Sequence, residues 1–127
     1  MVKETLVSFA RDAGWKLLAK LDSENLQITD AFWQYNEEEE AWRLVLATPL
    51  VTTEGPIVVY QHILAALNTI PEHEREDLLL SDISVVNSDS NLIAWMRSTY
   101  GTVSEGYGQR IRRIHLANNE QFIYRLQ

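Results

Sequence analysis

Cysteine is absent from all 127 positions of the sequence. Its absence excludes thiol catalysis, thiolate zinc sites and iron–sulfur ligation by this chain, and it is usual in a reducing cytosol. No apolar run approaches the roughly 20 residues of a membrane-spanning helix. The N-terminal stretch MVKETLVSFARDAGW carries early charges and is a poor signal peptide. We therefore expect a cytoplasmic protein with no membrane partner.

Catalytic and ligand-binding motifs are also missing. The chain has no G-x-S-x-G elbow for a serine nucleophile, and the turn at 52–56 has one glycine and no lysine for a phosphate. His62, His73 and His115 have no metal-ligand spacing. The sequence predicts no catalytic residue, metal or cofactor. It leaves enzymatic activity uncertain, with a non-enzyme favoured.

What is present fits one globular domain over residues 1–127, because 46% of the residues are hydrophobic and can form a core. The net charge is −7. Residues 1–82 hold 6 Lys and Arg against 15 Asp and Glu, whereas residues 83–127 hold 5 Arg against 3 Asp and Glu, so the two parts carry −9 and +2. Since an acidic field opposes phosphates, nucleic acid is an unfavoured partner.

The spacing of apolar residues predicts an α+β (mixed α/β) fold in the order α-β-β-α-β-α-β-β, with a five-stranded mixed sheet packed with helices. The expected helices are Thr5–Leu21, Ile57–Ile70 and Asn91–Tyr100, and the expected strands are Ala31–Asn36, Ala41–Thr48, Ile83–Asn87, Arg110–Ala117 and Gln121–Leu126. The first and last strand pairs are expected to form hairpins, and the second and third strands to pair in parallel across a helix. The sequence does not determine the strand order.

The helix Ile57–Ile70 is expected at the centre of the core, with its apolar first turn, Ile57–Tyr60, well buried. Thr52 to Pro56 resemble the start of this helix, with a capping threonine, an acid and a proline. In Ala41–Thr48 the side chains are expected to alternate, with Trp42, Leu44 and Leu46 on one side and Arg43, Val45 and Ala47 on the other. This pattern indicates a sheet with one well-buried face.

Four consecutive glutamates, Glu37–Glu40, separate the first two strands. Adjacent side chains at a hairpin tip point to different sides, whereas a carboxylate metal site needs oxygens that converge. We interpret the run as a solvated turn. A weak calcium site or a docking surface for a basic partner are the alternatives.

Two groups of residues are candidates for binding. The aromatic side chains Trp33, Tyr35 and Trp42 can share one face of the first hairpin, either as core or as an exposed patch for a partner. The second group is Arg97, Tyr107, Arg110, Arg112 and Arg113. These arginines either balance the excess acid or contact an anion or nucleic acid, with Tyr107 able to stack on a base.

The stretch AFWQYNEEEEAWRLVLATPLVTTEGPIVVYQHI resembles a pattern of short uncharacterised bacterial proteins. In that pattern an FW-x-Y strand and a WRL strand ending in Pro-Leu precede a helix opened by EGP. The resemblance implies a bacterial, cytoplasmic, single-domain protein and assigns no functional residues.

The leading hypothesis is a small non-enzymatic accessory or binding domain that acts through a protein partner or self-association. The alternative is an enzyme or nucleic-acid-processing protein whose site is assembled only in three dimensions. The candidate residues for such a site are the carboxylates Glu54, Asp82 and Asp89, with Arg97 or Arg110. A flat apolar patch would favour binding, and convergence of these charged groups would favour the alternative.

Overall fold

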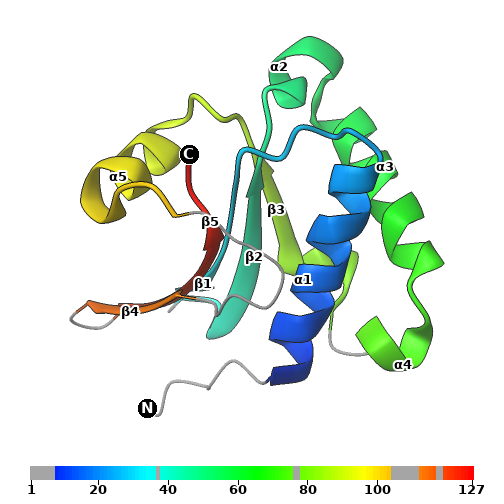
Figure 1. Ribbon diagram of the computed structural model, residues 1–127, viewed down its shortest axis with the longest axis horizontal. Helices are drawn as coiled ribbons and strands as arrows, with labels where there is room; N and C mark the ends of the chain where they lie inside the picture. The colour runs from blue at the N-terminus through cyan, green and yellow to red at the C-terminus, as the bar shows by residue number, and fades with distance from the viewer. Residues whose placement is uncertain (1–7, 37, 76–77, 104–111, 117–118) are drawn as a thin grey trace.

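The computed structural model describes residues 8–36, 38–75, 78–103, 112–116 and 119–127 and has an α+β fold, in which helices cover a mixed sheet (Figure 1). The elements are α1 (Ser8–Ser23), β1 (Asp30–Asn36), β2 (Ala41–Ala47), α2 (Leu50–Glu54), α3 (Pro56–Thr69), α4 (Glu72–Arg75), the 3-10 turn η1 (Leu80–Asp82), β3 (Ile83–Val86), α5 (Asn91–Tyr100), β4 (Arg112–Leu116) and β5 (Asn119–Arg125). The predicted α+β class, with a mixed sheet and helices packed on it, is therefore confirmed.

The strands form one sheet in the order β3-β2-β1-β5-β4. The β1–β2 and β4–β5 pairs are antiparallel, as the hairpin prediction requires, and β2 and β3 are parallel, as the intervening helix α3 requires. The chain reaches the centre of the sheet again only at its end, where β5 pairs with β1. That long-range pairing decides the strand order.

One face of the sheet is covered by α1 and α3 (Figure 1). Trp33, Leu44 and Leu46 point into this face and are almost fully buried. From the helices, Leu17 of α1 and Ile63 of α3 pack against the same cluster. The alternation predicted for the second strand is confirmed, because Trp42, Leu44 and Leu46 belong to this cluster and Val45 and Ala47 do not.

The opposite face is buried as well, which corrects the expectation of a single well-buried face. Helix α5 covers it, as Figure 1 shows, and places Ile93 and Met96 against Phe32, Val45 and Ile123. All five side chains are at most 3% exposed. The sheet is therefore a middle layer with helices on both sides.

A buried hydroxyl group ties α1 to the sheet. The side chain of Tyr124 on β5 accepts a hydrogen bond from Nε1 of Trp33 at 2.9 Å and donates one to the carbonyl oxygen of Arg11 at 2.5 Å. Burial raises the pKa of the Tyr124 hydroxyl well above its usual range. Gly14 faces this hydroxyl, and a Cβ atom at position 14 would lie 2.5 Å from it. The glycine, which costs helix propensity, is thus required for close approach.

Two local predictions before α3 are wrong. Thr52 and Glu54 belong to a separate short helix, α2, and do not start α3. Gly55, at φ 90°, ends α2 and precedes Pro56, the first residue of α3. A proline suits that position because it has no amide hydrogen to leave unpaired there. Gly55 provides no side-chain cap.

Helix α5 has the predicted bounds. Ser90 Oγ accepts a hydrogen bond from the amide of Ile93 at 3.4 Å, and Gly101 follows the last turn with φ 73°. No helix in the described ranges is long and apolar enough to cross a bilayer.

Candidate functional site

Helix α3 combines a buried face with an unusual outer face. Its sequence, PIVVYQHILAALNT, contains no Asp, Glu, Lys or Arg, although 23% of the whole chain is charged. Val59, Ile63 and Leu67 turn toward the sheet and are at most 2% exposed. These side chains anchor the helix, so its opposite face is held rigidly toward solvent.

The outer face carries two large apolar side chains. Ile57 is 72% exposed and Leu64 is 44% exposed. Together with the exposed amides Gln61 and Asn68 they follow the spacing i, i+4, i+7 and i+11, which places all four on one stripe of the helix. We call Ile57, Gln61, Leu64 and Asn68 the α3 stripe.

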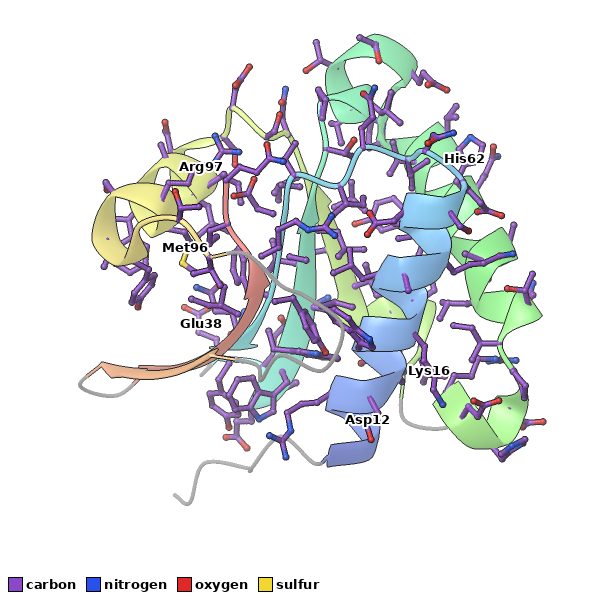
Figure 2. All side chains as sticks on the ribbon, in the orientation of Figure 1. Asp12, Lys16, Glu38, His62, Met96 and Arg97 are labelled. Atoms are coloured by element: carbon purple, nitrogen blue, oxygen red, sulfur yellow. The ribbon has the colours of Figure 1, made fainter. Side chains whose placement is uncertain are left out.

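Neighbouring residues extend this surface without adding charge. Ala65 and His62 are exposed beside the stripe, and His62 lies on the outer side of α3 in Figure 2. A charge-free surface with protruding aliphatic side chains is costly to leave in water and is typical of contact surfaces.

The expectation that the first turn of α3 is well buried is therefore wrong. Within that turn only Val59 is fully buried, while Val58 and Tyr60 are partly covered and Ile57 projects outward. The sheet can cover only one side of the helix, and Ile57 and Leu64 on the other side stay exposed. The lack of any charge over 56–69 was the sequence signal for this surface.

A cluster of charged and polar groups lies at the end of the sheet where the parallel strands β2 and β3 terminate. The Asp30 carboxylate at the start of β1 is 0% exposed. Arg97 of α5 donates to it from Nε at 3.0 Å and from Nη2 at 2.6 Å. Thr29 Oγ1 donates at 2.6 Å, and the amide of Gln127 donates at 3.1 Å. Figure 2 shows Arg97 beside the C-terminal end of the chain.

This arrangement is structural. A carboxylate has about four acceptor positions, and four donors already occupy those of Asp30. The hydrogen bonds that Arg97 donates to the Asp30 carboxylate raise the pKa of Arg97, so the guanidinium remains charged. Arg97, a binding candidate from the sequence, thus balances a buried acid and joins α5 to β1.

The aromatic candidates are core residues. Trp33, Tyr35 and Trp42 are between 2% and 8% exposed and lie beneath α1 and α3. Tyr35 pairs with Trp42 across the hairpin, with ring centroids 5.4 Å apart in an edge-to-face arrangement. The structure therefore supports the core interpretation of these three side chains and shows no exposed patch formed by them.

The remaining candidates of the basic group cannot be assembled into a site. Tyr107 and Arg110 lie outside the described residues, and for Arg112 and Arg113 only the backbone in β4 is described, paired with Ile123 and Phe122. Their contact with an anion or nucleic acid stays a prediction.

The charged groups of the enzyme alternative come together only in part: after the larger effect of Asp30, the nearby charge of Asp89 also raises the pKa of Arg97. Asp82 precedes β3 and accepts a hydrogen bond from the amide of Leu79 at 2.9 Å, whereas Asp89 follows β3. The four-residue strand β3 lies between the two in the chain. Glu54 is exposed at the end of α2. Across the described ranges, no group of three or more His, Asp or Glu side chains is placed to hold a metal ion.

The glutamate run behaves as a solvated turn in its described part. Glu38, Glu39 and Glu40 are exposed, and Glu37 lies outside the described residues. Glu39 accepts hydrogen bonds from Arg43 at 2.8 Å and 2.6 Å, which lower the pKa of its carboxyl group. Figure 2 shows Glu38 near the end of the sheet away from Arg97, so the turn and the Asp30–Arg97 pair do not form one site.

Comparison with protein-family models, with curated proteins and with solved structures finds no match to this chain. The resemblance to short bacterial proteins therefore remains one of local pattern. Function has to be argued from the α3 stripe and its surroundings.

Proposed function

We propose that this chain is a small non-enzymatic binding domain that acts through protein contact at the α3 stripe. The observation that carries the proposal is the 72% exposure of Ile57 on a helix without a single charged residue. Isolated exposed apolar residues are common on proteins, but an aligned, charge-free set on a rigid helix is characteristic of helix-mediated contacts.

The state of the charged groups supports the same proposal. Arg97 is used to neutralise Asp30, Arg43 is paired with Glu39, and Arg125 donates to Asp22 at 2.6 Å and 3.1 Å. Among these groups Arg97 is the one that the enzyme alternative would use on a substrate, and its hydrogen bonds go to Asp30. The cysteine-free sequence supports the further proposal of a reducing, cytoplasmic setting.

Site-specific photo-crosslinking tests the proposal. A photoreactive phenylalanine analogue is placed at position 57 in one variant and at position 79 in a control, because Leu79 is also exposed, at 56%, but lies outside α3. After irradiation in cells of the source organism, adducts are separated by mass and identified by mass spectrometry.

We expect discrete protein adducts from position 57 that disappear when Leu64→Glu is added, and none from position 79. The absence of adducts from position 57, or the same adducts from both positions, would contradict a binding function for this face.

A further inference from the structure

We propose that the molecule bound by the α3 stripe is a second copy of this chain, joined in a two-fold antiparallel pair of α3 helices. This inference rests on the proposed function and specifies its partner. It is supported by the spacing of the stripe, by the chemistry at its centre and by the distribution of charge.

The spacing of the stripe is self-complementary. Ile57 and Leu64 are seven residues apart, which is two helical turns and about 10 Å along the axis. If two copies of α3 cross antiparallel near Gln61, Ile57 of each copy meets the partner's Leu64, and both apolar contacts form at once. A two-fold interface requires such reciprocal contacts.

The residue at the centre suits a symmetric contact. Gln61 lies next to the midpoint of Ile57 and Leu64, and on the two-fold axis it would face the partner's Gln61. A primary amide has both donors and acceptors, so two identical glutamines can hydrogen-bond to each other. A charged residue at this position would instead meet a like charge.

The distribution of charge indicates which surface two copies of this chain can share. Two copies each carry −7 and repel one another over most of their surfaces. The repulsion is weakest where the surface has no charge, and α3 supplies that surface. By comparison, α1 carries Arg11, Asp12, Lys16, Lys20 and Asp22. A strongly basic partner protein would gain little from an uncharged stripe.

The size of the stripe sets the expected affinity. Stable interfaces use about 20–30 residues from each partner and bury about 800 Å² on each side. Four aligned side chains and their neighbours fall short of that, so we expect a weak dimer with a dissociation constant of roughly tens of micromolar or more.

Sedimentation equilibrium from low-micromolar to near-millimolar protein tests the inference. The apparent mass of the native chain should rise from 14.6 kDa toward twice that value. Ile57→Lys or Leu64→Glu alone should weaken self-association at least tenfold, because each places a charge against an apolar side chain of the partner. Leu79→Lys, the matched control on another exposed leucine, should leave it unchanged.

Mixing the Ile57→Lys and Leu64→Glu variants provides the sharpest readout. In the antiparallel pair, the introduced lysine of one variant would meet the introduced glutamate of the other, while the native Leu64 and Ile57 would meet on the other side of the axis. A one-to-one heterodimer should therefore form at low salt where neither variant associates alone. Coincident thermal melts of native and variant chains would show that the substitutions leave the fold intact.

The outcomes separate this inference from the proposed function. A chain that remains at 14.6 kDa at every concentration would overturn the second-copy inference, while crosslinks from position 57 to a different protein would leave the binding function standing. Self-association that is lost in Leu79→Lys but kept in Ile57→Lys would overturn the α3 pairing. Failure of the mixed variants to associate would overturn its antiparallel arrangement.

Discussion

Replacing Gly14 by alanine should destabilise the protein, although helix propensity alone predicts the reverse. Gly14 lies inside α1, where alanine is favoured over glycine by about 1 kcal/mol. The added Cβ, however, would lie 2.5 Å from the Tyr124 hydroxyl oxygen and 3.0 Å from Nε1 of Trp33. Both contacts are closer than ordinary van der Waals packing, so something must move.

The side chains that would have to move are firmly held. Tyr124 and Trp33 are each 2% exposed, and the hydroxyl group makes hydrogen bonds to Trp33 and to the Arg11 carbonyl. Overpacking costs about 1–3 kcal/mol, and straining two hydrogen bonds adds up to about 1 kcal/mol for each. After the gain of about 1 kcal/mol in propensity, we expect a net loss of about 2 kcal/mol.

Urea denaturation of four chains would measure this: native, Gly14→Ala, Tyr124→Phe and the double variant. Because phenylalanine lacks the hydroxyl oxygen, Gly14→Ala should cost less in that background, which gives a coupling free energy between the two positions. Ala19→Gly, an exposed substitution in the same helix, reports the propensity term alone. If Gly14→Ala is as stable as the native chain or more so, the proposed close contact is wrong.

Four further predictions follow from the described contacts. Leu67→Ala should lower the free energy of unfolding by about 2–5 kcal/mol, since Leu67 is 2% exposed on the sheet-facing side of α3; an unchanged denaturation midpoint would show that this side is not core. Asp30→Asn should lower the free energy of unfolding by about 2–4 kcal/mol, because the uncharged amide keeps one acceptor for donors that now surround a carboxylate; a neutral effect in the same assay would show that the Arg97–Asp30 hydrogen bonds do not stabilise the contact between α5 and β1. The Glu39–Arg43 pair lowers the pKa of Glu39 below its ordinary 4.5, so its contribution to stability is complete above about pH 4.5 and is lost as the pH falls through the folded pKa; NMR titration should show the low pKa in the native chain and a normal one in an Arg43→Ala variant. Finally, the acidic chain should cause no mobility shift of single- or double-stranded DNA or RNA even at low salt, and tight binding that is lost in Arg112→Ala would restore the nucleic-acid alternative.

Part of the architecture is local enough to follow from sequence. The bounds of α5 were predicted because helical spacing lies between three N-cap candidates, Ser88, Asp89 and Ser90, and a helix-ending Gly101; the structure shows Ser90 as the cap. The β1–β2 hairpin was predicted because a short polar connection joins two strand-like runs, which suits an antiparallel pair. In each case the interactions that decide the element lie within one short segment of the chain.

Other contacts that stabilise the fold join residues remote in sequence. In the sequence Asp30 ends a polar stretch, and only the fold brings it to Arg97, 67 positions away. Gly14 is a residue of low helix propensity within α1, and only the fold places the Tyr124 hydroxyl of β5 against it. Neither residue carries a local mark of its partner, so no sequence pattern could have identified these contacts.

The α3 stripe shows most clearly what the sequence determines and what the tertiary structure decides. The sequence by itself determined that residues 56–69 form an apolar, charge-free helix, because spacing and composition are properties of the chain. Only the tertiary structure decided which apolar residues became core and which became surface. The sheet covers one side of a cylinder, so Ile63 and Leu67 are buried while Ile57 and Leu64 remain exposed.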